Sequence, residues 1–127
     1  MPASGNKLIG VEERARLIPA PHARRHFKLG FDTVANALRP TLGPTGRTVL
    51  IEQMIRTESP EILNDAATIS ERIVELPLYE NSGAMLMRHL VWHVRDQVGD
   101  GTATAAVIAQ ALLRETTRHI AAGANPA

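Results

Sequence analysis

Two turns rich in glycine and threonine are the segments of this sequence best suited to chemistry. Gly101-Thr102-Ala103-Thr104 opens a predicted helix, whose first backbone N–H groups lack partners within the helix and attract an anion. The threonine hydroxyls add donors for phosphate oxygens. Leu42-Gly43-Pro44, which follows Thr41, exposes backbone that can approach the same ligand. The two turns together predict a phosphate site, provided that Gly43 and Gly101 lie side by side in the fold.

Two aspartates near these turns are suited to manage the charge of a phosphate. Asp100 directly precedes Gly101, and its carboxylate would repel phosphate unless a cation lay between them. Proteins usually bind Mg²⁺ through one or two carboxylates together with phosphate oxygens, so Asp100 is the candidate magnesium ligand. Asp65 lies at a predicted strand-to-helix junction, where it could orient water or a cation.

Each turn taken alone also has a purely structural explanation. Gly-Asp-Gly-Thr commonly caps a helix, and Leu-Gly-Pro-x-Gly commonly forms a simple turn. The sequence contains neither the P-loop pattern GxxxxGK[ST] nor GxGxxG. His89 and His93 have the i, i+4 spacing of metal ligands on a helix, but no third ligand is evident, which favours surface histidines.

The elements that must position these residues are mainly helical. The apolar periodicity predicts helices over residues 22–38, 66–73, about 78–98 and 102 to about 122. Strands over residues 48–52 and 61–64 would form one hairpin, linked by residues 53–60. Asp65 is the predicted cap of the short helix, and Arg39-Pro40 should end the first one. The predicted buried faces are Gly83, Leu86/Met87, Leu90/Val91, Val94 and Val98 on the third helix, and Ala105, Ile108, Ala109 and Leu112 on the last.

Composition limits the class of protein. The chain has 127 residues, of which 44% are hydrophobic, 3% aromatic and none cysteine. An aliphatic core is therefore expected, and disulfide scaffolds, thiolate zinc sites and cysteine nucleophiles are excluded. No run reaches the roughly 18 apolar residues of a membrane helix, and the N-terminus lacks a secretory core. A cytoplasmic protein is the default expectation.

Positive charge is concentrated near the N-terminus, although the whole chain has a net charge of only +1. The basic residues of this segment are Lys7, Arg14, Arg16, Arg24, Arg25 and Lys28, and only Glu12 and Glu13 oppose them. A basic arm can bind nucleic acid. Here the two glutamates dilute the charge and no aromatic residue precedes Phe27, so a solvated tail is favoured over a nucleic-acid interface.

The combined motifs resemble the start of the group I chaperonin (GroEL-type) family. In chain order they are Thr41-Leu42-Gly43-Pro44-x-Gly46-Arg47, Asn64-Asp65, Glu80-Asn81-x-Gly83-Ala84, Gly99-Asp100-Gly101-Thr102-x-Thr104, Ala109-Gln110 and Ala121-Ala122-Gly123-x-Asn125-Pro126. In that family this stretch is the N-terminal half of the equatorial, ATP-binding domain. The resemblance implies a mainly α fold of chaperonin equatorial-domain-like helices with one β-hairpin. Residues 22–127 would be a partial equatorial domain, preceded by a flexible extension over residues 1–21.

The resemblance also implies ATP and Mg²⁺ as cofactors. Thr41, Leu42, Gly43 and Pro44 would line the nucleotide site, and Gly101, Thr102 and Thr104 would grip the phosphates. Asp100 would hold Mg²⁺, and Asp65 would match the family's aspartate beside the γ-phosphate, which makes it the candidate catalytic residue. Residues 49–51 and 62–64 would form the hairpin that pairs with a neighbouring subunit. The expected partners are other chaperonin subunits in a ring or homo-oligomer, with unfolded proteins as partners of a longer form only.

Departures from the family pattern bear on hydrolysis. Asn64-Asp65-Ala66 stands where the family usually has Lys-Asp-Gly, and Ala103 replaces a threonine of the phosphate turn. The family is an ATPase, but its later equatorial segment, which carries a catalytic aspartate, is not among these residues. We therefore expect a chaperonin-like ATP-binding protein related to ATP-dependent protein folding, with an incomplete nucleotide site, and leave its enzyme activity open. The alternative is a truncated chaperonin relative that acts as a non-hydrolysing oligomerisation or interaction module.

Overall fold

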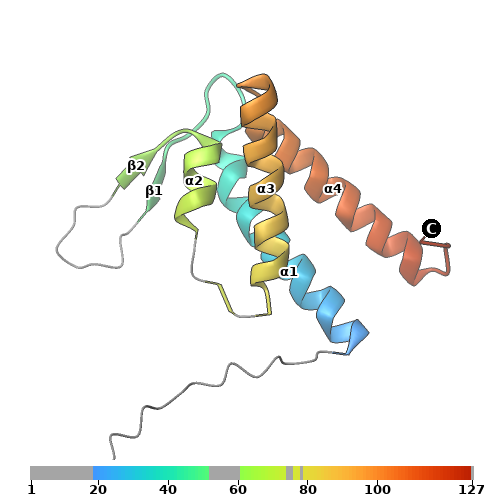
Figure 1. Ribbon diagram of the computed structural model, residues 1–127. Helices are drawn as coiled ribbons and strands as arrows, with labels where there is room; N and C mark the ends of the chain where they lie inside the picture. The colour runs from blue at the N-terminus through green and yellow to red at the C-terminus, as the bar shows by residue number, and fades with distance from the viewer. Residues whose placement is uncertain (1–18, 52–60, 74–75, 78, 127) are drawn as a thin grey trace, which may run out of the picture.

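The computed structural model is mainly helical, with one small antiparallel sheet (Figure 1). It describes residues 19–51, 61–73, 76–77 and 79–126. The elements are α1 (Ala20–Leu38), the 3₁₀ turn η1 (Arg39–Thr41), β1 (Val49–Ile51), β2 (Glu61–Leu63), α2 (Ala66–Arg72), α3 (Asn81–Val98) and α4 (Thr102–Ala121). The predicted fold class is confirmed. Within the described part of the chain, no helix is both long enough and apolar enough to cross a membrane.

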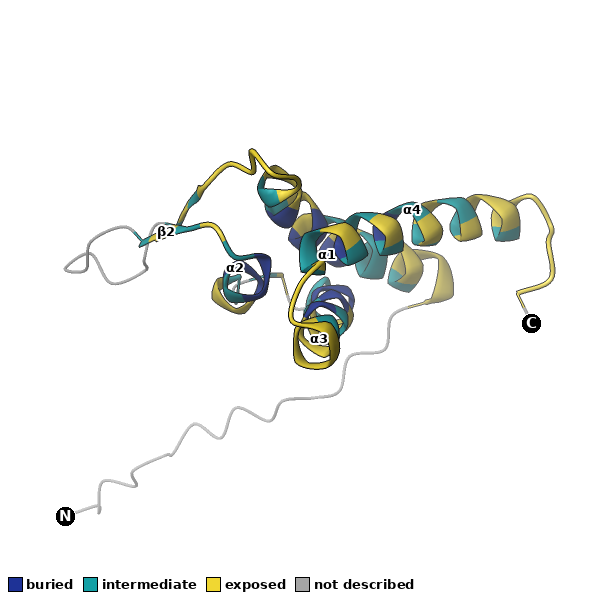
Figure 2. Cartoon of the chain, turned by 90° about the horizontal axis from the view of Figure 1, so that it is seen from above, coloured by how far each residue is buried: buried dark blue, intermediate teal, exposed yellow. Residues whose placement is uncertain are grey.

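The helices α1 and α3 pack side by side, with α2 and the hairpin on one side and α4 on the other (Figures 1 and 2). Two glycines allow this close approach. A Cβ atom on Gly83 would lie 1.8 Å from the carbonyl oxygen of Phe27, and one on Gly30 would lie 1.8 Å from that of Glu80. Any side chain at either position would therefore push the two helices apart.

The core is aliphatic, as the composition predicts. Its fully or almost fully buried apolar residues are Phe31, Val34, Ala35, Leu38, Ala66, Ala67, Ile69, Ala84, Met87, Val91 and Ala106. They come from α1, α2, α3 and α4, and Figure 2 shows the buried faces turned toward one another between α1, α2 and α3. Leu38, Ala66 and Ala106 of this core lie within three residues of Thr41, Asp65 and Thr104, so the core helps to fix where these predicted site residues lie.

Most element boundaries agree with the sequence. The helix α1 begins at Ala20, two residues before the predicted start, because Pro21 is tolerated in a first helical turn where N–H groups have no helical partner. The helix α3 begins at Asn81 rather than near residue 78, after a turn in which the N–H of Glu80 donates to the carbonyl of Pro77 over 2.8 Å. The first 18 residues of the predicted extension and the hairpin link over residues 53–60 lie outside the described residues.

The hairpin forms in the predicted place. The strands pair antiparallel with Val49 opposite Leu63, Leu50 opposite Ile62 and Ile51 opposite Glu61. Leu50 and Ile62 share one face of the hairpin, and they are 66% and 69% exposed. Within the described residues the sheet has two strands, so each strand also presents one edge without a partner strand there.

The predicted buried face of α4 is wrong for two of its four residues, while Ala105 is half-buried and Ala109 packs against the core. Ile108 and Leu112 are 55% and 64% exposed, whereas Ala106 and Gln110 are the buried residues of this helix. Hydrophobicity favours burial of isoleucine and leucine over glutamine. The amide of Gln110, however, forms hydrogen bonds to residues of α1 and η1, which offset the free-energy cost of burying it. On α3 the prediction holds for Gly83, Met87 and Val91 and fails for Leu86 and Val98, which are exposed.

Candidate functional site

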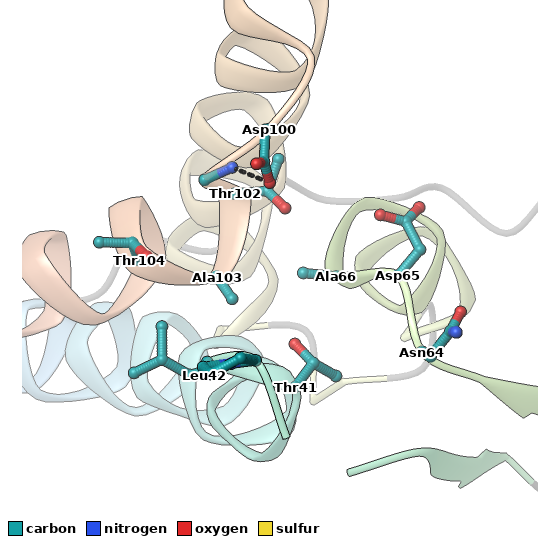
Figure 3. A pocket seen from close by; sticks show the side chains of 12 residues that line it. Thr41, Leu42, Asn64, Asp65, Ala66, Asp100, Thr102, Ala103 and Thr104 are labelled. Atoms are coloured by element: carbon teal, nitrogen blue, oxygen red, sulfur yellow. Dashed lines mark hydrogen bonds between the residues drawn. The ribbon is translucent and has the colours of Figure 1, made fainter. Parts of the chain in front are cut away.

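A cavity of about 440 Å³ lies where the loop after α1, the start of α2 and the start of α4 meet (Figure 3). Its lining residues are Thr41, Leu42, Gly43, Pro44, Asn64, Asp65, Ala66, Asp100, Gly101, Thr102, Ala103 and Thr104. Every residue that the sequence analysis assigned to the site is among them. The two glycine turns, which lie almost 60 residues apart in sequence, therefore face one space.

The loop wall of this cavity, residues 41–44, is shaped by the end of α1. The N–H of Leu42 donates to the carbonyl of Arg39 over 3.1 Å, and the Thr41 hydroxyl donates to the carbonyl of Leu38 over 2.7 Å. The chain then turns at Gly43, whose φ of 89° favours glycine over any residue with a Cβ. The Thr41 hydroxyl hydrogen is thus already used, and its oxygen remains as an acceptor.

The opposite wall is the N-terminus of α4. Gly101, with a φ of 77°, precedes the helix, and the first helical hydrogen bond joins the N–H of Ala105 to the carbonyl of Gly101. The N–H groups of Thr102, Ala103 and Thr104 therefore have no carbonyl within the helix to bind. Three consecutive amide donors lie at this end of the cavity, together with the positive end of the helix dipole.

Asp100 lies beside these amides rather than among them. Its Oδ1 atom accepts from the N–H of Gly101 over 2.6 Å, the dashed line in Figure 3. The carboxylate is exposed, and Figure 3 shows it near Thr102 at the upper rim of the cavity. One of its oxygens is thereby held in place, which leaves the other free to bind a cation.

Asp65 caps α2 from the third side of the cavity. Its Oδ2 atom accepts from the N–H of Thr68 over 3.0 Å, from the Thr68 hydroxyl over 2.6 Å and from Arg95 Nη1 over 3.0 Å. Partial burial works to raise the pKa of this carboxyl, but the Thr68 hydrogen bonds and the charge of Arg95 outweigh that effect and hold the pKa below its ordinary value of 3.8. Asp65 is therefore ionised at neutral pH and is a weak proton acceptor.

The charges of the lining residues limit which ligands the cavity can bind. Among the described residues that line it are two carboxylates, Asp65 and Asp100, and no lysine, arginine or histidine. A bare phosphate would gain the amides of α4 but would meet the carboxylate of Asp100 and that of Asp65, whose charge Arg95 offsets only from outside the cavity lining. A phosphate that carries a divalent cation removes this conflict, because the cation binds the carboxylate and the phosphate together. The donor set therefore fits a magnesium–phosphate group.

Three lining residues were not assigned to the site from the sequence: Asn64, Ala66 and Ala103. Each is the direct neighbour of an assigned residue, so adjacency along the chain was the available signal. Asn64 is exposed at the end of β2, and Ala66 is buried at the first position of α2. Ala103 packs partly against the core, so its N–H but not its side chain is suited to a ligand.

A protein-family model matches most of this chain. The model of the TCP-1/cpn60 chaperonin family matches residues 34–127, well over half of the chain. The match begins in the second half of α1 and includes the whole cavity, the hairpin and the described part of the last three helices. The chain therefore belongs to the TCP-1/cpn60 chaperonin family, and the matched stretch is its equatorial-domain region.

Proposed function

We propose that residues 22–127 act as part of a chaperonin equatorial domain that binds Mg²⁺-ATP in the cavity between the loop wall and α4. The observation that carries this proposal is the meeting of two turns, distant in sequence, around one cavity whose donor set suits a magnesium–phosphate group. Membership of the chaperonin family supports the same ligand. The wider role would be in ATP-dependent protein folding.

Each wall has a distinct part in this proposal. The amides and hydroxyls of Thr102 and Thr104 bind phosphate oxygens, with Gly101 allowing the turn that aims them. The exposed side chain of Leu42 and the backbone of Gly43 and Pro44 contact the rest of the nucleotide. Asp100 would hold the metal, which supplies the positive charge that draws the phosphates between the two carboxylates.

Asp65 is a poor candidate for proton abstraction and a better one for orientation. Its lowered pKa weakens it as a base, and its Oδ2 atom is occupied by Thr68 and Arg95. The remaining carboxylate oxygen could orient water or the metal beside the phosphates. We therefore expect this chain to bind nucleotide tightly enough to measure, while phosphate release stays near the uncatalysed background.

Titration calorimetry with Mg²⁺-ATP tests the proposal. Binding should weaken at least about tenfold in Asp100→Asn, because one metal ligand loses its charge. Asp96→Asn is the matched control: this exposed aspartate lies four residues earlier, in the last turn of α3, its carboxylate accepts from Gln97, and it does not line the cavity. Absence of heat with the unchanged chain, or equal losses in both variants, would refute the proposed site.

A second proposed function rests on the hairpin. Leu50 and Ile62 form an exposed cross-strand apolar pair next to unpaired strand edges, a surface that suits the addition of a strand from another subunit. The family indicates assembly with other chaperonin subunits. Sedimentation should show that Leu50→Lys dissociates oligomers and that Leu112→Lys, on the exposed face of α4, does not. The reverse result would move the interface to α4.

A further inference from the structure

Gln110 differs from the other buried polar residue in the described part of the chain. Ser70 bonds within its own helix, where its hydroxyl donates to the carbonyl of Ala67 over 2.6 Å. Gln110 is 9% exposed and directs its whole amide away from α4, toward α1 and η1. It lies about two helical turns after the phosphate-facing start of α4. A buried amide that bonds only across an interface fixes how the two elements sit against each other.

The amide of Gln110 uses both its acceptor and its donors. Its Oε1 atom accepts from Arg39 Nη2 over 2.8 Å, while its Nε2 atom donates to Asp32 Oδ1 and to Asn36 Oδ1, each over 3.0 Å. Asp32 also pairs through its other oxygen with Lys28. The amide thus lies between a guanidinium and a carboxylate, with its oxygen toward the cation and its nitrogen toward the anion, which is the favourable direction of its dipole.

Arg39 connects this network to the loop wall of the cavity. It is the first residue of η1, and its carbonyl accepts the N–H of Leu42 over 3.1 Å. The next residue, Pro40, accepts the N–H of Arg47 over 2.8 Å, which closes the loop from its other end. The side chain of Arg39 therefore ties the start of the loop to α4, whose own N-terminus forms the opposite wall.

We propose that Gln110 is a positioning residue for the nucleotide cavity: through Arg39 it sets the separation between residues 41–44 and the first amides of α4. The inference rests on the proposed function for the identity of the ligand. The effect of Gln110 on the separation of the two walls does not depend on any ligand. Glutamine suits this place because an amide offers an acceptor to Arg39 and donors to Asp32 at once. A carboxylate of the same shape would keep the bond from Arg39, lose the two bonds that Nε2 donates to Asp32 and Asn36, and repel Asp32.

The test exchanges donor and acceptor within the network. In the full chain, Gln110→Glu should weaken Mg²⁺-ATP binding about tenfold or more, as expected for loss of a hydrogen bond to a charged group and a new repulsion. Asp32→Asn alone keeps an acceptor for Gln110 and should change affinity less than about twofold. The double variant Asp32→Asn/Gln110→Glu again joins a donor to an acceptor, so its affinity should return to within about threefold of the unchanged chain.

Amide hydrogen exchange without nucleotide gives a second readout. Exchange of the Leu42 N–H should accelerate in Gln110→Glu and slow again in the double variant, because this bond is made to the Arg39 carbonyl. Val91→Ala, a core substitution outside the cavity and the network, controls for general destabilisation. It should lower the melting temperature and leave affinity unchanged at a temperature where the chain is folded.

The outcomes separate the two proposals. If the unchanged chain does not bind Mg²⁺-ATP, the proposed function fails. Exchange of the Leu42 N–H then still tests whether Gln110 positions the loop. If Gln110→Glu leaves both exchange and affinity unchanged, the positioning role is overturned. If the single variant unfolds, the double variant decides: recovery of fold and binding supports the role, and failure to recover either one overturns it.

Discussion

The two sides of the cavity are held by different kinds of interaction. Behind the loop wall, α1 and η1 are joined to α4 through Gln110, a buried amide with three hydrogen bonds. The start of α2 is joined to α3 through the Asp65–Arg95 ion pair, whose side chains are 45% and 42% exposed. On its outer side α2 is tied to β2 by a two-bond contact between Arg72 and Glu61.

This difference teaches which side of the cavity is fixed and which can adjust. A buried amide is satisfied in one geometry only, so it specifies the distance between the elements that it joins. An exposed ion pair tolerates movement, is screened by salt and contributes little free energy. We therefore regard the side formed by the loop wall and α4 as the rigid frame, and the exposed Asp65–Arg95 pair at the start of α2 as the part that can adjust to a ligand.

The largest expected effect comes from removing the amide of Gln110. Gln110→Leu keeps the size of the side chain but leaves Arg39, Asp32 and Asn36 without their partner, and we expect a loss of about 2 kcal/mol in the free energy of unfolding. Urea denaturation measures it. Gln97→Leu, on the exposed end of α3, is the control and should cost less than about 0.5 kcal/mol. Equal costs would remove the contrast between the two sides.

Asp65→Ala should have the next largest effect. It removes the N-cap of α2 and the partner of Arg95, and the loss of a cap costs about 1 kcal/mol of stability. Asp65→Asn retains a side chain that can cap the helix, so chemical denaturation should place it between Asp65→Ala and the unchanged chain. A cost above that of Gln110→Leu would reverse the assignment of the rigid side.

The pKa of Asp65 gives the α2 side a pH dependence. Because its folded pKa is below the ordinary value of 3.8, the ionised carboxylate stabilises the fold at pH values above the unfolded pKa. This contribution is lost as the pH falls through the folded pKa. The stability difference between the unchanged chain and Asp65→Asn should therefore be full near pH 6 and shrink below about pH 4. A difference that does not change with pH would show that Asp65 acts only as a neutral cap.

Arg95→Gln should have the smallest effect. Exposed ion pairs contribute between about 0.2 and 1 kcal/mol, and the Thr68 hydrogen bonds to Asp65 remain in this variant. The contribution of its ion pair with Asp65 should disappear at about 1 M salt, where the Debye length falls to about 3 Å. The cost of Gln110→Leu should persist there, since it arises from hydrogen bonds rather than from exposed charges. Unfolding curves at low and high salt measure this contrast.

The sequence was a good guide to local structure and a poorer guide to burial. Apolar periodicity located the helices, and Asp65 caps α2 as its position after a strand predicted. The same periodicity placed Ile108 and Leu112 of α4 in the core, because it assigns burial by hydrophobicity and is blind to partners on another helix. Gln110 appeared in the sequence only as part of an Ala-Gln motif, and nothing local marked it as a buried residue.

The sequence by itself determined which chemical groups are present: glycines where the backbone needs a positive φ, amides without helical partners at the start of α4, and carboxylates beside them. These are properties of short segments, set by sterics and hydrogen bonding over a few residues. Only the tertiary structure decided that the segments face one cavity, that Arg95 pairs with Asp65, and that Gln110 joins α4 to α1 and η1. Each of these depends on how α1, α3 and α4 pack, and packing is decided by contacts between residues far apart in the chain.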